Sequence, residues 1–414
     1  MADRKVDYLL IGGGLASANC ARWLREQGAD GDVLLVGREP DPPYNRPECS
    51  KGYLRAEESR EDTFFRPNDW WGGQNIELLT RTSVTALDLG SRTAKLSTKQ
   101  EVEFGQALIA TGANVRRLDV DGCHLENIHY LRTLGNADAI RQTTADADEV
   151  VLIGGSYIGT EVAASLTKLG KHCTIVMQEE HTLERTFGAQ AGRFFGHLLE
   201  EQGVRIHGRE ELDRFEGDGT VAKVVTKEGL ELAADAVVIG AGVMPDTQLA
   251  KNAGLAIGDL RGVTCDSRLQ TSAPGIYAAG DICEYDSVIH RGPVRIEHWD
   301  VAFNQGRTAA LNMLGREHDH DVVPYFYSVL ADWGELEYVG PAYEWDEEIV
   351  RGSFEERNFT LFYLAKGVVK AALTWGRSGD LEAARRFIAD AMPLDQRRRE
   401  ALADTESDLE TDMR

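Results

Sequence analysis

The sequence from Val6 to Ser17, VDYLLIGGGLAS, decides the fold of this chain. Its apolar run Tyr8–Ile11 predicts a strand, and the glycines that follow lead into a helical pattern that continues through Arg25. A second apolar strand is expected at Val33–Val36. Strand, glycine turn, helix and strand in this order are typical of the βαβ unit that binds a dinucleotide. The pyrophosphate then lies at the helix N-terminus, where free N–H groups and the helix dipole favour an anion.

Three small residues in this turn have separate tasks. Gly12 allows the tight turn, and Gly14 lets a phosphate approach the backbone. Ser17 stands where a third glycine is usual, and a small side chain is tolerated at a close contact between helix and strand. A glycine motif alone can be a simple turn, but here a strand precedes it and a helical pattern follows it.

The same arrangement recurs about 140 residues later. A strand is predicted at Glu149–Ile153, followed by the turn Gly154–Gly159, a helix through Leu169 and a strand at Cys173–Met177. Ser156 replaces the middle glycine, so the phosphate is expected to approach a little less closely. Two such units in one chain indicate two dinucleotides side by side, an arrangement suited to electron transfer between them.

Short motifs outside these units indicate how the domains are connected. Ala110, Thr111 and Gly112 follow the apolar strand 107–109, and the sequence IYAAGD closes another strand at 276–281. Both motifs are assigned to the first nucleotide site. We therefore predict a discontinuous first nucleotide-binding domain, a second one inserted in it, and an α+β C-terminal domain. Their predicted ranges are 1–114 with 247–324, then 115–246, then 325–414.

The C-terminal domain is expected to open with Pro324 and the aromatic cluster 325–327. A helix is predicted at Leu381–Met392, and the charged stretch Asp395–Arg414 is expected to be frayed. The predicted strands of this domain are Leu336–Val339, Ile349–Arg351, Phe359–Leu364 and Val368–Leu373.

Composition excludes several classes of protein. The 414 residues carry a formal charge of −23, which opposes nonspecific nucleic-acid binding because such binding requires Lys and Arg to neutralise phosphates. No apolar run approaches the roughly 20 residues that a membrane-spanning helix needs. The first residues show neither a long apolar segment nor a small-residue cleavage site. We expect a cytoplasmic protein without a membrane span.

The six cysteines are scattered and form no C-x-x-C pair. This spacing suits a reducing compartment and argues against zinc or an iron–sulfur cluster held by the chain. We therefore predict no metal site and expect a non-metallic electron carrier.

Two further motifs carry a resemblance to a known family. The sequence PYNRPECSK at 43–51 imperfectly matches a P-Y-x-R-P-P-L-S-K signature, and the sequence RIEHW occupies 295–299. With these motifs, nearly the whole chain resembles the FAD-dependent pyridine nucleotide-disulfide oxidoreductases. The resemblance is specifically to the group that joins oxygenase-coupled ferredoxin reductases to apoptosis-inducing factor. Ferredoxin reductases usually read Glu-Ser-Trp at the second motif and apoptosis-inducing factor reads Glu-His, so this chain is a hybrid.

The resemblance implies an α/β fold with two Rossmann-like domains of the glutathione reductase type and FAD in the first. Glu39 is expected at the adenosine ribose, although Arg38 occupies a position that is often acidic in the family. Asp281 is expected at the ribityl chain or pyrophosphate, next to the N-terminus of a helix that follows it. The implied FAD contacts are Gly12, Gly14, Leu15, Ala16, Arg38, Glu39, Arg46, Lys51, Val84, Ala110, Thr111, Gly112, Arg132, Asp281, Glu297, His298 and Tyr327.

For the nicotinamide nucleotide, the resemblance favours NADH over NADPH. Glu179 falls where apoptosis-inducing factor has an acid that binds the ribose, and an acid there would repel a 2′-phosphate. The alternative is that Glu179 is merely exposed. The implied contacts with this nucleotide are Gly155, Ser156, Tyr157, Ile158, Glu179, Gly242 and Glu337.

Lys51 and Glu161 are the candidate catalytic residues, because the resemblance brings them together beside the flavin N5. A lysine there stabilises negative charge on the reduced ring, and a carboxylate fixes its position. The alternative is a surface salt bridge of little consequence. Tyr327 stands where relatives commonly have a tryptophan against the flavin, or it is a core aromatic residue. Cys49 has no second cysteine near it in the sequence, so a small buried residue is favoured over a redox role.

Three functional hypotheses follow. The first is an NADH-dependent FAD reductase whose acceptor is a small acidic iron–sulfur carrier of the ferredoxin type, or a rubredoxin-like protein. The second is a redox-sensing NADH oxidoreductase like apoptosis-inducing factor, and the third is a reductase of a quinone or of monodehydroascorbate. The sequence is compatible with a monomer or a homodimer.

Overall fold

The computed structural model describes residues 2–412 and separates into two compact units, each made of three stretches of chain. The first unit comprises Met1–Asn45, Arg60–Asn114 and Val243–Val322. The second unit comprises Arg46–Ser59, Val115–Gly242 and Val323–Arg414. Residues 115–242 of the second unit are thus inserted in the sequence of the first unit, and the C-terminal segment groups with them. Met413 and Arg414 lie outside the described residues.

One short segment, Arg46–Ser59, differs from the prediction, which assigned it to the first domain. It begins with the 3₁₀-helix η1 (Arg46–Ser50), which contacts α3 (Leu134–Ala145) and α4 (Tyr157–Lys168) of the second unit. The Ser165 hydroxyl donates a hydrogen bond of 2.6 Å to the Ser50 carbonyl. These contacts come from residues more than 80 positions away, so local sequence patterns do not reveal them.

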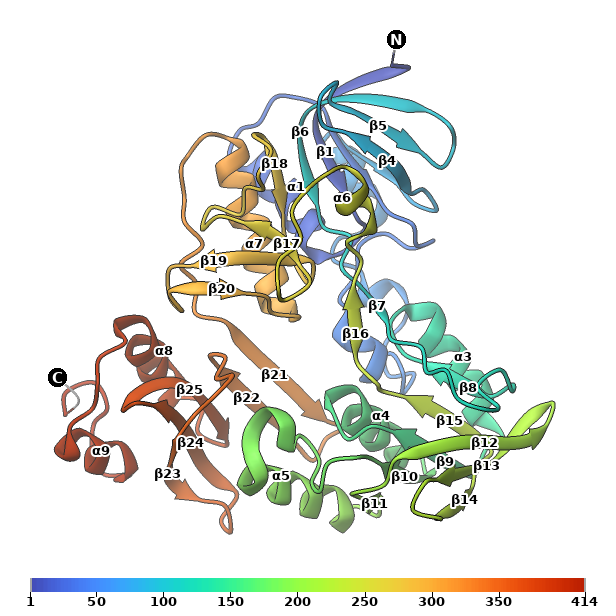
Figure 1. The fold of residues 1–414 in the computed structure, drawn as a ribbon, viewed down its shortest axis with the longest axis vertical. Helices are drawn as coiled ribbons and strands as arrows, with labels where there is room; N and C mark the ends of the chain where they lie inside the picture. The colour runs from blue at the N-terminus through green and yellow to red at the C-terminus, as the bar shows by residue number, and fades with distance from the viewer. Residues whose placement is uncertain (1, 413–414) are drawn as a thin grey trace. The chain divides into compact units, whose positions relative to one another are not determined.

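A seven-stranded sheet forms the centre of the first unit (Figure 1). The predicted strand pair is present, with Tyr8 opposite Val33 and Ile11 opposite Val36 in parallel register. The strands run in the order β3 (Ile76–Leu79), β2 (Val33–Val36), β1 (Arg4–Ile11), β6 (Glu101–Ile109), β5 (Thr93–Leu96) and β4 (Val84–Asp88), with β18 (Ile276–Ala278) beside β6.

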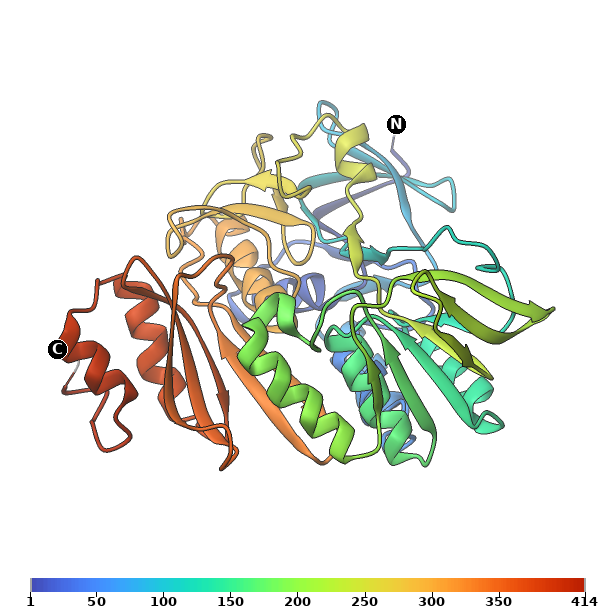
Figure 2. The same cartoon turned by 60° about the horizontal axis from the view of Figure 1, so that its bottom comes forward.

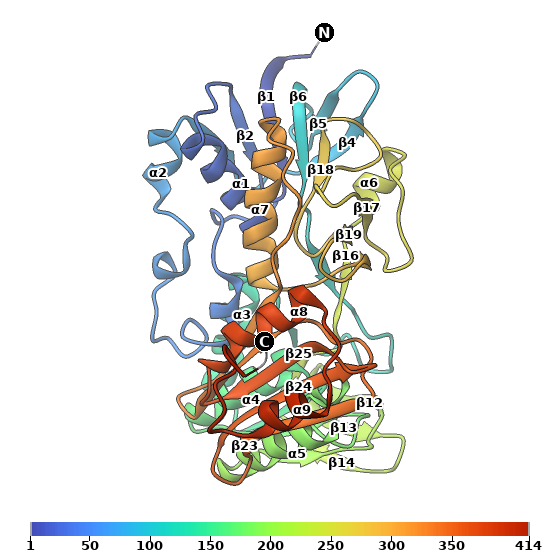
Figure 3. The same ribbon diagram turned by 90° about the vertical axis from the view of Figure 1, so that its left-hand side faces the viewer.

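Two long helices pack against each other on this sheet (Figure 3). Helix α1 (Leu15–Glu26) begins directly after the glycine turn, and α7 (Trp299–Met313) lies along it. A side chain at Gly306 would lie 2.4 Å from the Ala16 carbonyl oxygen, so glycine permits this close approach. The other helices of the unit are short: η2 (Glu61–Thr63), α2 (Asn68–Gly73) and α6 (Gln248–Asn252).

A small sheet of β17 (Val263–Cys265), β19 (Cys283–Ser287) and β20 (Gly292–Val294) completes the first unit. It corrects one prediction, because the chain after Asp281 enters β19 and not a helix. Cys283 and Tyr285 of β19 are fully buried in the core, and their pairing with Val263 and Cys265 holds this stretch extended.

The second unit contains a five-stranded parallel sheet that repeats the βαβ arrangement. The predicted strand Glu149–Ile153 is present as β9, and the helix after it is α4. The strands run in the order β11 (Arg205–His207), β10 (His172–Val176), β9 (Glu149–Ile153), β15 (Ala236–Ile239) and β8 (Ile128–Tyr130). The fold class predicted from the sequence is thereby confirmed.

An antiparallel sheet of three strands and the helix α5 (Glu184–Glu201) belong to the same unit. Gly188 interrupts α5 with a φ of +79°. The three strands are β12 (Leu212–Asp218), β13 (Thr220–Thr226) and β14 (Glu231–Ala233). The short strands β7 (Ala113–Val115) and β16 (Val243–Pro245) lie where the chain passes between the two units.

The C-terminal segment forms an antiparallel sheet whose two faces are covered differently. Figure 2 shows α8 (Asp380–Asp390) and α9 (Gln396–Ala403) along one side. From α5, Phe194 packs edge-on against Phe359 and Trp375. The strands run in the order β21 (Tyr325–Leu330), β22 (Gly334–Val339), β25 (Val368–Trp375), β24 (Asn358–Ala365) and β23 (Glu347–Ser353).

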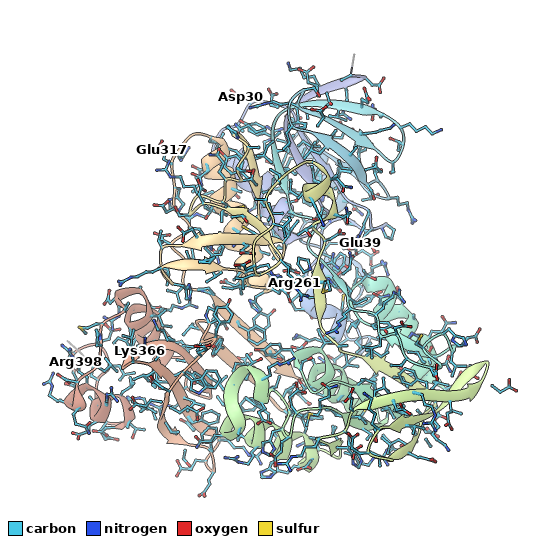
Figure 4. All side chains as sticks on the ribbon, in the orientation of Figure 1. Asp30, Glu39, Arg261, Glu317, Lys366 and Arg398 are labelled. Atoms are coloured by element: carbon cyan, nitrogen blue, oxygen red, sulfur yellow. The ribbon has the colours of Figure 1, made fainter. Side chains whose placement is uncertain are left out.

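The expected fraying of Asp395–Arg414 is wrong for the part that the structure describes. Asp395 caps α9 by accepting a hydrogen bond of 2.9 Å from the Arg398 amide, and Figure 4 labels Arg398 on this helix. The side chain of Arg351 is 5% exposed, and its guanidinium donates to the carbonyls of Asp404, Thr405 and Ser407. A buried cation from β23 therefore orders a segment that is charged and looks unstructured in sequence.

Candidate functional site

The glycine turn of the first unit is shaped to receive an anion. Gly12 has a φ of +120°, and a side chain there would lie 2.1 Å from the Ala110 carbonyl oxygen. Gly14 is the N-cap of α1, no side chain caps the helix, and nothing lies within 4 Å of the position where a Cβ would be. The amides of Leu15 and Ala16 follow in the first turn. This open helix N-terminus fits the pyrophosphate of a dinucleotide.

The end of β18 lies against the same turn. Gly280 has a φ of +78°, and a side chain there would contact the Cβ atoms of Ala16 and Ala302. The Gly280 amide donates a hydrogen bond of 2.7 Å to the Gln305 side chain on α7. Asp281 is the next residue, so the structure brings it close to the N-terminus of α1.

Arg38 and Glu39 follow β2, and their side chains have different partners. The Tyr44 hydroxyl donates to the Glu39 carboxylate at 2.6 Å; Figure 4 labels Glu39. Arg38 donates to Asp246 at 3.0 Å and to Asn114 at 2.5 Å. Glu39 is thus oriented by a buried tyrosine, whereas Arg38 ties two chain segments together.

The motif after β6 runs beside the glycine turn. The Ala110 amide donates to the Ile11 carbonyl at 2.8 Å, and the Thr111 hydroxyl donates to the Asp246 carbonyl at 2.7 Å. Gly112 has a φ of +71°, a conformation that favours glycine. Val84, in contrast, is a strand residue of β4 that lies opposite Leu96.

Glu297 and His298 lie just before α7. Arg295 donates to the Glu297 carboxylate at 2.5 Å and to the Asp281 carbonyl at 2.9 Å, which links the two predicted FAD positions. The His298 ring accepts a hydrogen bond of 3.2 Å from the Asp300 amide and so caps α7.

The glycine turn of the second unit has the same geometry with other residues. Gly154 has a φ of +105°, and a side chain there would lie 2.6 Å from the Gly240 carbonyl oxygen. A side chain at Gly155 would meet the Met177 sulfur, and one at Gly159 would lie 2.0 Å from the Gly154 carbonyl oxygen. Ser156 is the exposed N-cap of α4, and its side chain does not cap the helix.

Several predicted NAD positions surround this second turn. Tyr157 and Ile158 open α4, and the Tyr157 ring packs 4.2 Å from Phe326 and 5.8 Å from Phe187, centroid to centroid. Burial raises the pKa of the Tyr157 phenol. Gly242 has a φ of +85° with open space where a Cβ would be. This open backbone suits the close approach of a nucleotide.

Glu179 lies after β10, at the same place in the βαβ unit that Glu39 occupies in the first. Its carboxylate is 34% exposed and lies 3.9 Å from the guanidinium of Arg185, which is 88% exposed. The Arg209 amide donates to the Glu179 carbonyl at 2.9 Å. The carboxylate therefore remains accessible to a ligand.

Lys51 and Glu161 form a buried ion pair with an N–O distance of 2.7 Å. Their side chains are 8% and 5% exposed. Glu161 also accepts hydrogen bonds from Ser50 at 2.5 Å and from Ser328 at 2.6 Å. Because the pair is buried and two hydroxyls donate to Glu161, it differs from the surface salt bridge that was the alternative.

Tyr327 and Glu337 come from neighbouring strands of the C-terminal sheet, where they are paired in register. The Lys51 ammonium lies 5.8 Å from the centre of the Tyr327 ring. Burial, assisted by nearby carboxylates, raises the pKa of the Tyr327 phenol to about 12. Glu337 accepts a hydrogen bond of 2.7 Å from Tyr325. The Tyr327 ring thus lies near the ion pair, and Glu337 is held by Tyr325 on the neighbouring strand.

Arg46 and Arg132 also belong to the second unit, where Arg46 donates to the Arg132 carbonyl at 2.8 Å. The sequence analysis missed Ser50 and Ser328, the two hydroxyls that orient Glu161. Ser50 adjoins Lys51 in the signature, so it could have been found, whereas Ser328 is brought in only by the strand β21. Cys49 is 3% exposed, as its interpretation as a small buried residue requires.

Two broader findings concern residues 2–412 alone. In this part of the chain, no helix is long and apolar enough to cross a membrane. Within the same residues, no group of three or more His, Cys, Asp or Glu side chains is arranged to hold a metal ion.

Comparison with known proteins identifies two sequence families. The family described as "Pyridine nucleotide-disulphide oxidoreductase" matches residues 6–306, and the one described as "Reductase C-terminal" matches residues 332–413. The first match includes both glycine turns, and the second includes most of the C-terminal sheet.

Individual relatives align with most of the chain. Putidaredoxin reductase CamA of Pseudomonas putida is 33% identical over 395 residues, which cover 94% of this chain and 93% of that protein. Apoptosis-inducing factor 3 of Homo sapiens is 30% identical over 360 residues, 86% of this chain and 58% of that protein. The crystal structure of a covalent putidaredoxin reductase–putidaredoxin complex matches with a TM-score of 0.93 and 32% identity, covering 100% of this chain and 99% of the other.

Proposed function

Because the chain belongs to the pyridine nucleotide-disulphide oxidoreductase family, we propose that it is an NADH-dependent FAD reductase that supplies electrons to a small iron–sulfur carrier protein. FAD and a pyridine nucleotide are the cofactors that this family implies. The observation that carries the proposal is the pair of glycine turns, each of which leaves a helix N-terminus without a side-chain cap. Two such turns give one chain two dinucleotide sites.

We assign FAD to the turn of the first unit and the nicotinamide nucleotide to the turn of the second. Gly14, Asp281 and Glu39 are the polar contacts proposed for the pyrophosphate and the adenosine ribose. The preference for NADH rests on Glu179, because its partly exposed carboxylate would bind a free 2′-hydroxyl and repel a 2′-phosphate. Replacing Glu179 with Ser should therefore lower the ratio of kcat/KM for NADH to kcat/KM for NADPH.

When bound, FAD would supply the redox chemistry, because a flavin ring can accept a hydride. Lys51 would provide a fixed positive charge for the electron density that a hydride adds. Glu161 holds that ammonium in place, and the hydroxyls of Ser50 and Ser328 hold Glu161. Because the pair is nearly inaccessible to water, its charges act more strongly than they would at the surface. Tyr327 contributes an aromatic face beside the ammonium.

The carrier protein is proposed from the relatives, several of which are named ferredoxin reductases, and from charge on the first unit. Arg22, Arg66 and Arg307 lie over the aromatic rings of Trp23, Phe65 and Phe303, of which Phe65 and Phe303 contact each other. All six side chains are partly or mostly buried, so each guanidinium is held in place. Fixed arginines and aromatic rings suit an acidic protein partner.

Reduction of an acidic [2Fe–2S] ferredoxin by NADH tests the proposal. We expect multiple turnover in the presence of the ferredoxin, and a lower rate for Arg66→Glu while reduction of the flavin is unchanged. Lys5→Glu is a matched control, since Lys5 is 71% exposed and pairs with Glu103, which is not a member of this cluster. Failure to reduce any ferredoxin or rubredoxin from the source genome would count against the carrier.

A second function is favoured by residues shared with apoptosis-inducing factor. Glu297–His298, Glu179 and Glu337 carry that likeness, and apoptosis-inducing factor 3 is among the relatives. In this alternative, slow reduction changes oligomeric state or partner binding. A persistent charge-transfer band together with a redox-dependent change in mass would support it, and fast turnover with a carrier would exclude it. Oxidation of the reduced protein by a quinone or by monodehydroascorbate would identify a small-molecule acceptor.

A further inference from the structure

Glu48 is a departure of this chain from the signature in which it stands. The pattern P-Y-x-R-P-P-L-S-K has proline at this position, and here it reads PYNRPECSK. Glu48 lies in η1, three residues before Lys51, and its carbonyl accepts the Lys51 amide at 3.0 Å. An acid has therefore been added to the turn that carries the lysine of the ion pair.

A second acid, Glu58, reaches the same turn because of a glycine. Gly52 is buried, and a side chain there would lie 2.8 Å from the Glu58 carboxyl carbon and 2.9 Å from one of its oxygens. The Glu58 carboxyl thus occupies the space that Gly52 leaves open, directly after Lys51. There it is hydrogen-bonded to the Glu48 carboxyl.

Two carboxyl groups can hydrogen-bond to each other only if one of them carries a proton. Burial raises the pKa of Glu48 to about 7, and the negative charge of Glu58, the hydrogen bond with Glu58 and the charge of Glu161 act in the same direction. Lys51 opposes them by stabilising the ionised form. The proton is thus held in the range where cells and enzyme assays operate.

The other groups around η1 are already engaged. On the α3 side, Tyr53 donates to Asp138, and Arg141 lies over the Tyr53 ring. Within η1, Arg46 donates to a carbonyl. On α4 the facing charge is Glu161, and on β21 the facing group is Tyr327. The charge of Glu48 contributes to the raised pKa of the Tyr327 phenol. Lys51 is therefore the cation that the carboxylates Glu48 and Glu161 have in common, and Glu58 acts on it through Glu48.

We propose that Glu48 and Glu58 share one proton and that this proton sets the net charge around Lys51 while a hydride is accepted. The proposal rests on the function proposed above, in which Lys51 stabilises the reduced flavin. Glu48 then acts through Lys51, by changing the net charge around it, and does not donate a proton to the flavin. A hydride brings two electrons and one proton, so the shared proton stays on the carboxyl pair.

The charge of Glu48 determines whether a rise in pH speeds or slows reduction of the flavin. Below about pH 7 Glu48 is protonated, and Lys51 is balanced by fewer carboxylates. The arrival of a hydride adds one negative charge, so it is favoured in this state. Above about pH 7 Glu48 ionises, and the additional negative charge opposes reduction. A unit charge within several ångströms of a partly buried site changes such a rate by about tenfold.

The test is the rate of flavin reduction by NADH, followed anaerobically in the FAD-loaded protein from pH 5.5 to about 8.5, on either side of the Glu48 pKa. We expect about a tenfold fall centred near pH 7. Glu48→Gln, and Glu48→Pro, which restores the signature, should remove the step and keep the high rate. Glu58→Gln should move the step to lower pH. Glu57→Gln is the matched control, because this neighbouring acid pairs with Arg55 and Lys168 and should leave the step unchanged.

A second readout does not depend on activity. Infrared spectra of the oxidised protein without NADH should show a protonated carboxylic acid whose band disappears near pH 7 and is absent in Glu48→Gln. A pH-independent reduction rate with no such band would contradict the proposal that Glu48 and Glu58 share a proton. If the band is present but the flavin is not reduced by NADH, the proposed function fails while the carboxyl pair stands. If the band is present and reduction proceeds without a pH step, the pair has no influence on Lys51 and the proposal fails.

Discussion

The two glycine turns keep glycine at different positions of the same motif and carry serine at the others. In the first unit glycine is kept at the second position, Gly14, and the third position is Ser17. In the second unit the second position is Ser156, and glycine is kept at the third, Gly159. Gly14 and Ser156 have similar φ values of −93° and −82°, so the backbone does not demand glycine at either place.

The difference lies in what each turn leaves open to a ligand. At Gly14 the space that a Cβ would occupy is open, whereas Ser156 places an exposed side chain at the corresponding position of the second turn. The first turn therefore lets a phosphate approach more closely. This difference suits a cofactor that stays bound in the first unit and a nucleotide that exchanges at the second.

Gly12→Ala should have the largest effect. The new methyl group would overlap the Ala110 carbonyl oxygen at 2.1 Å, and the φ of +120° is unfavourable for alanine. We expect a loss of about 4 kcal/mol in the free energy of unfolding and purification without FAD. Flavin absorbance per protein and urea unfolding would measure both effects.

Gly72→Ala is the control for this variant. Gly72 has open space around it and a negative φ, so the variant should retain both FAD and stability. Full flavin content in Gly12→Ala would contradict the assignment of FAD to the first turn.

Gly159→Ala should damage the second turn and spare the first. A methyl group there would lie 2.0 Å from the Gly154 carbonyl oxygen and push the turn away from α4. We expect FAD to be retained while the KM for NADH rises by more than about tenfold, a change of about 1.4 kcal/mol in binding. Gly135→Ala, whose methyl group would meet only the Thr133 hydroxyl at 3.8 Å, should change neither quantity.

Ser156→Gly should make the second turn resemble the first. Its hydroxyl makes one long contact of 3.4 Å with the Gly240 carbonyl, and glycine at an N-cap costs only a few tenths of a kcal/mol. Because a phosphate could approach more closely, we expect NADH to bind about threefold more tightly. Weaker binding in a titration of the oxidised protein would show that the serine contacts the nucleotide.

Ser17→Ala should have the smallest effect on function. Ser17 is fully buried in the described structure, and its hydroxyl has no hydrogen-bond partner there. Removing an unsatisfied buried hydroxyl should raise the free energy of unfolding by about 1 kcal/mol without loss of FAD. Ser165→Ala is the matched comparison, because that buried hydroxyl bonds to Ser50 and its loss should destabilise the protein.

Much of the fold could be predicted because its signals are local. Val33–Val36 and Glu149–Ile153 are short apolar strands bounded by polar or glycine residues, and the structure gives them the same bounds. The errors occur where distant residues decide. Burial in the core extends the chain after Asp281, and Arg351 orders the tail from a strand about 50 residues earlier.

The candidate site shows the same division. The two turns could be predicted from local sequence patterns, but the contact between Lys51 and Glu161 was predicted only from the family resemblance. Ser328 and the Glu48–Glu58 pair were not indicated at all, because nothing near them in sequence records which side chains face them. The functional role of every residue named in the site stays a prediction.

Anaerobic stopped-flow mixing of the purified protein with NADH and, separately, NADPH tests the central claim most directly. The account predicts a flavin spectrum that NADH bleaches faster than NADPH, followed by rapid reoxidation when an acidic [2Fe–2S] ferredoxin is added. A protein without a flavin spectrum, or a bound flavin that neither nucleotide reduces, would contradict it.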